Sequence, residues 1–102
     1  MPYIKHADRL TIALHEDTQG PFVPRHEGEL NYMITSLCLR FLKQEGINYG
    51  NINAVVGALE CAKLEMYARL ARPYEDQKIV ENGDVYPDDP SALTRPMVPD
   101  KT

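Results

Sequence analysis

The chain has 102 residues, of which 43% are hydrophobic and 25% are charged, and its formal net charge is −4. This length allows one domain, and the composition is ordinary for a soluble protein. The basic residues are scattered, so the sequence lacks the concentrated basic face that duplex nucleic acid or an anionic membrane requires. We therefore expect neither as a partner. A chain this small buries only a small core, which favours a homo-oligomer.

The cellular location is predicted from the short length of the apolar segments. The longest uncharged apolar run, Asn53 to Leu59, is far shorter than the roughly 20 residues that cross a bilayer, and the first residues do not resemble a secretory signal. We expect a cytoplasmic protein. Cys38 and Cys61 both fall inside helical patterns, so they are interpreted as reduced structural thiols.

The proline pattern divides the chain into one helical domain, residues 1–86, and a Pro-rich tail, residues 87–102. Proline interrupts helices and central strands, and the tail has four prolines at positions 87, 90, 96 and 99. Near the other end, Asp8 is placed to cap a short helix that runs to about Asp17. Gly20, Pro21 and Pro24 then interrupt the chain.

Two long segments have helical periodicity. In residues 27–45, apolar side chains recur every three or four positions, and Gly46 follows as a stop. Asn51 is placed to cap a second helix that keeps the same period to about Ala71. Pro73 opens a shorter helix that ends at Asn82 and Gly83. The predicted fold is all-α, a small helical bundle of two long antiparallel helices and two shorter ones.

One arc of the second long helix carries Asn53, Glu60, Lys63 and Tyr67 at spacings of seven, three and four. An amide, a carboxylate, an ammonium and a phenol therefore share one face of the helix. This arc is the most site-like feature of the sequence. The alternative interpretation is a surface ion pair beside a tyrosine that covers the edge of the core.

Other helix faces carry a polar residue and two sets of candidate contact residues. Asn31 lies on the apolar arc of the first long helix, where a buried amide requires either a structural hydrogen bond or a ligand. On the opposite arc, Tyr32 and Leu39 favour an interface with another molecule. A strip of small side chains on the second long helix predicts close approach of a partner helix, and it consists of Ala54, Gly57, Ala58 and Cys61.

Known catalytic patterns are missing from the sequence. No two carboxylates stand three or four residues apart on a predicted helix so as to share a metal, and no P-loop or dinucleotide fingerprint occurs. Neither serine lies on a nucleophile turn, and no histidine is close in sequence to a cysteine. We therefore predict no catalytic residues, metal or cofactor. Catalysis by residues assembled across subunits stays open.

Aromatic rings and cations gather within a short stretch of the chain. Flat rings and cationic donors are what a nucleotide base and phosphate require. The rings belong to Tyr49, Tyr67 and Tyr74, and the cations to Lys63, Arg69, Arg72 and Lys78. Tyrosines at the edge of the core beside solvated charges are the competing interpretation.

Several motifs of residues 28–86 resemble those of a family of small uncharacterised proteins found in bacteriophages and bacteria. They are GELNY at 28–32 with IT at 34–35, Tyr49 with NIN at 51–53, LE at 59–60 with Lys63, Glu65 and Tyr67, and YED at 74–76 with Lys78 and ENGDVY at 81–86. This chain departs from the family pattern at Ala68, where a basic residue is usual. The resemblance implies a phage setting, hence the host cytoplasm, and no established activity.

Small phage proteins without catalytic clusters often act by binding. The hypothesis is a homo-oligomer whose pockets capture a small anionic, nucleotide-like ligand, with Lys63 and Arg69 on phosphate and Tyr67 stacking. Asn53 and Glu60 would contact base or sugar edges, and Asn31 and Tyr74 complete the set. The first alternative is an interaction protein that grips a host or virion protein through Tyr32, Leu39 and the tail. The second is a nucleotide-modifying enzyme.

Overall fold

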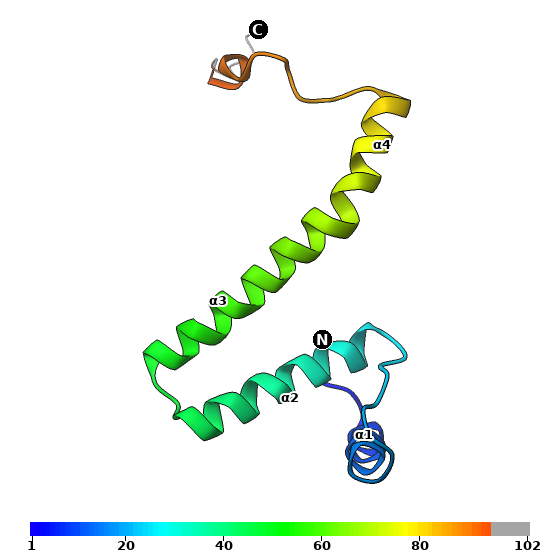
Figure 1. The fold of residues 1–102 in the computed structure, drawn as a ribbon, viewed down its shortest axis with the longest axis vertical. Helices are drawn as coiled ribbons and strands as arrows, with labels where there is room; N and C mark the ends of the chain where they lie inside the picture. The colour runs from blue at the N-terminus through cyan, green and yellow to red at the C-terminus, as the bar shows by residue number, and fades with distance from the viewer. Residues whose placement is uncertain (95–102) are drawn as a thin grey trace, which may run out of the picture. The chain divides into compact units, whose positions relative to one another are not determined.

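The computed structural model describes residues 1–94, apart from the side chains of Ala92 and Thr94. In this part of the chain every regular element is a helix, which confirms the all-α prediction (Figure 1). The chain divides into two compact units, one of residues 1–58 and one that begins at Leu59. The helices are α1 (His6–Gln19), α2 (Glu27–Glu45), α3 (Tyr49–Met66), a π-helical turn (Tyr67–Ala71), α4 (Arg72–Asn82) and a 3-10 turn (Pro90–Thr94).

Helix α1 begins three residues earlier than the sequence indicates. Lys5 precedes its first residue and makes no side-chain cap, while Asp8 lies inside the first turn. An acid in the first turn still interacts favourably with the partial positive charge of the helix N-terminus. At the other end, Gly20 has a φ of 92°, a conformation that glycine adopts readily. Ile12 is the buried apolar side chain of this helix, with 3% of its surface exposed.

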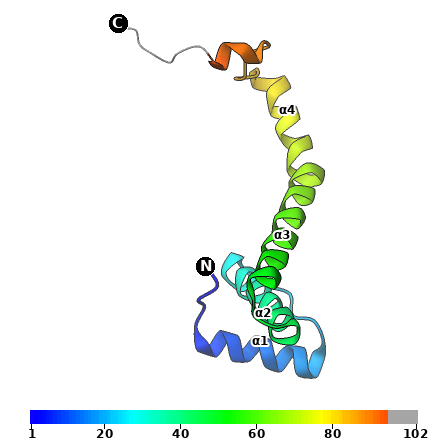
Figure 2. The same ribbon diagram turned by 90° about the vertical axis from the view of Figure 1, so that its left-hand side faces the viewer.

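Helix α1 crosses the N-terminal half of α2 within the first unit, as Figures 1 and 2 show from two sides. The guanidinium of Arg9 lies over the ring of Tyr32, 5.7 Å from its centroid, and its Nε donates to the carbonyl of Ile4. Such cation–π contacts stabilise by about 0.5–1 kcal/mol at exposed sites. These contacts hold the N-terminal segment, α1 and the start of α2 together.

The start of α2 is capped by His26. Its Nδ1 accepts from the backbone N–H groups of Gly28 and Glu29, at 3.1 and 3.4 Å, which satisfies two of the free donors of the first turn. Gly28 is also tightly surrounded, because a Cβ there would stand 3.3 Å from Cγ2 of Ile4. The glycine therefore lets the N-terminal segment approach the helix.

Glu29 forms the most buried polar contact of the described residues. Its carboxylate has no exposed surface, pairs with the guanidinium of Arg25, and accepts the backbone N–H of Arg25 at 2.8 Å. These hydrogen bonds lower the pKa of Glu29 to about 2, against the opposing effect of desolvation, and the positive charge of Arg25 lowers it further. The N-terminus of α2 is thus held by a charge pair that the periodicity of the sequence does not reveal.

The link between α2 and α3 is built from asparagines. Gly46 ends α2 with a φ of 106° and donates its N–H to the carbonyl of Leu42, as expected of a glycine stop. Asn51 was predicted to cap α3, but Asn48 does so by accepting the N–H of Asn51 at 2.8 Å. The side-chain amide of Asn51 instead donates to the carbonyls of Glu45 and Gly46, at 3.1 and 2.9 Å. It therefore closes the end of α2.

The second long helix and the shorter one that follows form one uninterrupted helical run from Tyr49 to Asn82. The prediction placed a boundary near Ala71, yet Ala71 and Arg72 both keep right-handed helical torsions. The chain accommodates Pro73 by a π-helical turn in which the N–H of Arg72 donates to the carbonyl of Tyr67. A proline lacks the N–H that would reach the carbonyl four residues back and crowds that carbonyl, and the wider turn relieves the conflict.

Gly83 ends α4 as predicted, with a φ of 89° and an N–H that donates to the carbonyl of Ile79. Asp84 then accepts the backbone N–H of Tyr86, which makes a local turn. The predicted tail begins at residue 87 and holds the 3-10 turn. Its last eight residues, 95–102, lie outside the described part of the chain.

Candidate functional site

Glu60 and Lys63 form the first part of the predicted arc. Their side chains make an ion pair of 3.1 Å between Nζ and Oε1, and both are more than half exposed. Tyr67 follows Lys63 by four residues, so it lies on the same face of the helix, and 53% of its surface is exposed. An ammonium and an exposed phenol ring therefore lie next to each other on this face.

Arg69 lies on a different face from Lys63. Its Nε pairs with Oε2 of Glu65 at 2.6 Å, one helical turn back. Because each residue turns an α-helix by about 100°, Glu65 stands about 200° around the helix from Lys63. The structure thus joins Arg69 to the opposite side of the helix and not to the arc of Lys63 and Tyr67.

Arg72 is the cation that the sequence reading left out of the site. A π-helical turn contains about 4.4 residues, so a residue five positions after Tyr67 is brought close to the same face. The backbone hydrogen bond from Arg72 to Tyr67 marks this turn. The guanidinium of Arg72 pairs with Asp76, and this hydrogen bond and charge raise the pKa of Arg72, with a smaller contribution from Tyr67. Pro73 was the feature of the sequence that could have indicated this π-helical turn, and with it the position of Arg72.

Tyr74 and Lys78 make a second ring-and-cation contact on α4. Nζ of Lys78 lies 5.5 Å from the centroid of the Tyr74 ring and 3.3 Å from Oε1 of Glu81. Tyr74 is 59% exposed. The face of the Tyr74 ring is therefore already in contact with Lys78 of the same chain.

Asn31 and Asn53 belong to the first unit, and the other five candidates belong to the second. Asn31 is half-buried, and its Oδ1 accepts from Oγ1 of Thr35 at 3.3 Å, which is a local structural hydrogen bond. Asn53 is exposed on α3. Among the seven candidate ligand residues, a described ion pair joins only Glu60 to Lys63.

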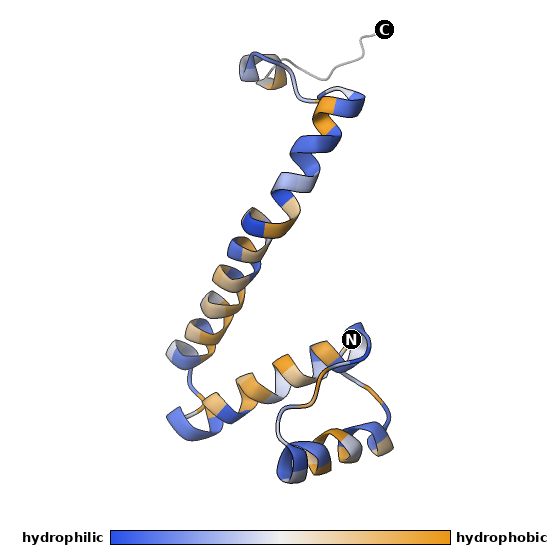
Figure 3. Ribbon diagram, turned by 45° about the vertical axis from the view of Figure 1, so that its right-hand side comes forward, coloured by the Kyte–Doolittle hydropathy of each residue, from blue (hydrophilic) through white to orange (hydrophobic). Residues whose placement is uncertain are grey.

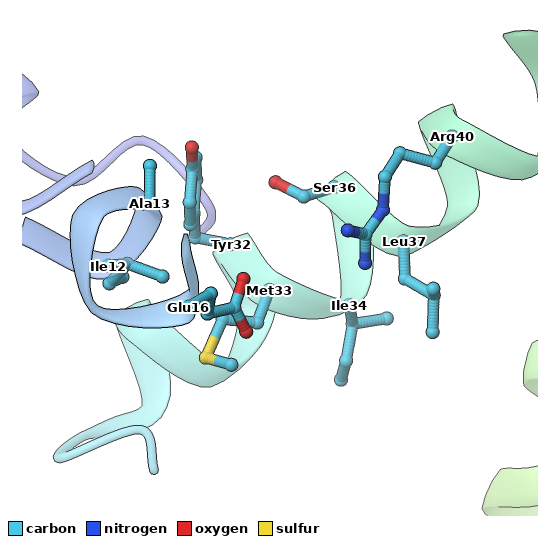
Figure 4. A pocket seen from close by; sticks show the side chains of 9 residues that line it. All are labelled: Ile12, Ala13, Glu16, Tyr32, Met33, Ile34, Ser36, Leu37 and Arg40. Atoms are coloured by element: carbon cyan, nitrogen blue, oxygen red, sulfur yellow. The ribbon is translucent and has the colours of Figure 1, made fainter. Parts of the chain in front are cut away.

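A pocket between α1 and α2 was not anticipated from the sequence. Its volume is about 410 Å³, within the range of small-molecule sites. It combines an apolar floor with the charged ends of Glu16 and Arg40, neither of which has an ion-pair partner among the described residues. Figure 4 shows the nine side chains that line it: Ile12, Ala13, Glu16, Tyr32, Met33, Ile34, Ser36, Leu37 and Arg40.

The predicted interface residues differ in exposure. Tyr32 is half-buried beneath Arg9 and lines the pocket, while Leu39 is 57% exposed on α2. The small residues of α3 are exposed, and a Cβ added at Gly57 would meet no atom within 4 Å. The members of this exposed strip are Ala54, Gly57, Ala58 and Cys61. Their role as an interface stays a prediction.

No group of three or more histidine, cysteine, aspartate or glutamate side chains among the described residues has the geometry to hold a metal ion. None of the helices that these residues form is long and apolar enough to cross a membrane.

Comparison with known proteins identifies a family. No curated protein and no solved structure matches the chain. A family model described as a domain of unknown function (DUF6899) matches residues 1–85. The match covers all four α-helices and extends the resemblance seen in residues 28–86 to the N-terminus. The chain therefore belongs to this uncharacterised family.

Proposed function

We propose that this protein acts by binding, as a homo-oligomer that captures a small anionic, nucleotide-like ligand, and that it sequesters a signalling nucleotide in the cytoplasm of a phage-infected host. The observation that carries the proposal is the face formed by Lys63, Tyr67 and Arg72, where the π-helical turn adds a guanidinium to an ammonium and an exposed ring. Cationic side chains such as Lys63 and Arg72 bind phosphate groups, and an exposed ring such as that of Tyr67 offers a stacking face for a base.

The charge pairs on this face are compatible with ligand binding. Lys63 and Arg72 each have a carboxylate partner on the same helix, and all four side chains are about half exposed or more. Exposed pairs of this kind stabilise by only about 0–1 kcal/mol. A phosphate carries more charge and more acceptor oxygens than a carboxylate, so it can displace Glu60 and Asp76 at small cost. Arg69 faces away and makes no direct contact in this proposal.

The test is titration calorimetry of the full chain with a panel of nucleotides, namely ATP, GTP, cyclic AMP and NAD. We expect one of them to bind, and the double variant K63A/R72A to lose at least tenfold in affinity while its circular dichroism keeps the helical signal. The single variant R69A is the matched control, because it removes a paired arginine from the other face of the same helix. Equal losses in R69A and in K63A/R72A, or no binding by any nucleotide, would contradict the proposal.

A protein partner is the second candidate function, supported by the exposed apolar side chain of Leu39. Deletion of the tail after Tyr86 separates the two candidates. A protein that binds through Lys63, Tyr67 and Arg72 keeps its nucleotide affinity after the deletion. A protein that grips a host or virion partner with its tail loses that partner in a pull-down from infected cells.

A further inference from the structure

One face of α2 carries an exposed apolar seam. Hydropathy colouring shows apolar residues recurring along this helix (Figure 3). Four of them follow one another at spacings of four, three and four residues and are 40–60% exposed. They are Leu30, Ile34, Leu37 and Phe41. This spacing is the a/d pattern by which two helices pack side by side.

The charged residues beside the seam occupy the positions that select a partner helix. With Ile34 and Phe41 at a, Leu30 and Leu37 are at d, Arg40 is at g, and Glu45 is at e of the next heptad. Neither Arg40 nor Glu45 has an ion-pair partner among the described residues. In a parallel helix pair, g of one helix faces e of the other helix five residues further on.

Charge complementarity therefore selects a second copy of the same helix in parallel. Parallel pairing places Arg40 of each copy against Glu45 of the other, which gives two symmetric ion pairs. Antiparallel pairing places g against g, and the g positions of α2 hold His26, Met33 and Arg40, so Arg40 finds no acid there. Among the described residues, four charged side chains of α2 have no ion-pair partner on their own chain: Glu27, Arg40, Lys43 and Glu45. The parallel arrangement pairs the two of them that flank the seam, Arg40 and Glu45.

A shallow hollow in α2 suits this packing. Its volume is about 450 Å³, and it is lined by Leu37, Arg40, Phe41, Gln44 and Glu45. In helix pairs of this type, each apolar side chain of one helix enters a hollow formed by four residues of the other. The seam, the hollow and the unpaired charges therefore lie on one surface.

We propose that α2 pairs in parallel with α2 of a second copy along the seam of Leu30, Ile34, Leu37 and Phe41, fixed by ion pairs between Arg40 and Glu45. This rests on the homo-oligomer of the proposed function and names its contact surface. The surface differs from the predicted interface of Tyr32, Leu39 and the small residues of α3.

The first experiment is sedimentation equilibrium of the full chain and three charge variants. R40E and E45R each replace two attractive contacts with two repulsive ones, so we expect either to raise the self-association Kd roughly tenfold. The double variant R40E/E45R restores both pairs in reverse and returns the Kd to within about twofold. K43E is the matched control, because it makes the same charge change on α2 away from the seam.

The second experiment fixes the direction of pairing. The background is C38S/C61S, provided that this variant forms an oligomer of the same mass as the wild type. In it, the Cys introduced by L30C forms a disulfide with the same residue of the second copy only if the two α2 helices are parallel. In an antiparallel pair, residue 30 faces residue 41, and the two copies of residue 30 are roughly 16 Å apart, too far for a disulfide. A mixed disulfide between L30C and F41C chains would overturn the proposal.

The remaining outcomes are also decisive. A monomer at every concentration overturns both this proposal and the oligomer of the proposed function. An oligomer whose Kd is unaffected by R40E overturns the seam alone. Nucleotide titration of R40E reports separately on ligand binding, because Arg40 lies outside the face of Lys63, Tyr67 and Arg72.

Discussion

The guanidinium of Arg25 and the carboxylate of Glu29 pair at the start of α2, and Glu29 is left with no exposed surface. The variant E29Q keeps the shape of the side chain and removes its charge. We expect a lower melting temperature at pH 7, because a guanidinium and a backbone N–H lose a charged acceptor. Thermal circular dichroism measures this change, with E27Q, an exposed acid of the same turn, as the control.

The same pair predicts a dependence of stability on pH. The pKa of Glu29 is about 2 in the folded chain and close to 4.5 when unfolded, so the folded value is the lower one. Its contribution to stability is therefore complete above about pH 4.5 and is lost as the pH falls toward 2. Urea midpoints measured between pH 6 and pH 2.5 should fall less steeply for E29Q than for the wild type. Parallel slopes would show that Glu29 does not carry this effect.

Asn51 supports the end of α2 from a position within α3. The variant N51A loses two hydrogen bonds to backbone carbonyls, and we expect it to cost about 1–2 kcal/mol of unfolding free energy. N53A removes an exposed asparagine from the same helix and should change the free energy by less than about 0.5 kcal/mol. Urea unfolding checks both variants, and equal effects would contradict the role assigned to Asn51.

Pro73 is the proposed cause of the π-helical turn. In P73A the new N–H can donate to the carbonyl of Arg69, so the turn should close to an ordinary α-helical one and the helix should become more stable. Backbone chemical shifts of residues 66–73 and the melting temperature report these changes. The register change also moves Arg72 away from Tyr67, so nucleotide affinity should fall although stability rises. A π turn that persists in P73A would show that another contact holds it.

Gly57 allows a test of the small-residue strip. Glycine inside a helix costs about 0.5–1 kcal/mol relative to alanine, and a Cβ at this position has open space. G57A should therefore stabilise the chain by about that amount. If the strip packs against a partner helix, G57L should weaken self-association, which sedimentation equilibrium detects. Unchanged association in G57L would remove the strip from the interface.

The sequence predicted the parts of the fold that depend on local periodicity. Both ends of α2 follow from its apolar spacing and from Gly46, and Gly83 stops α4 as expected. The capping residues were harder to predict from the sequence. Several polar side chains near the start of a helix are able to cap it, and tertiary geometry selects one of them. Asn48 and not Asn51 caps α3 for this reason. The pairing of Glu29 with Arg25 depends on the loop that precedes α2, which helical spacing cannot place.

The candidate site was predicted only in part. The helical wheel placed Lys63 and Tyr67 together, which their four-residue spacing ensures. A helical wheel does not place Arg72 beside Tyr67, because a wheel assumes a constant rotation per residue and the π-helical turn changes that rotation. The proximity of Arg72 to Tyr67 therefore requires the backbone path and not only the residue types.

The π-helical turn also bears on how length varies in the family. A turn closed from residue i to i+5 holds one residue more than an α-helical turn, so it is equivalent to a single-residue insertion. Replacement of Pro73 by another residue, together with deletion of one residue from 67–71, would leave a regular helix without shifting α4 relative to α3. Relatives that lack this proline should therefore tend to be one residue shorter here, and the presence of the two features should be inherited together.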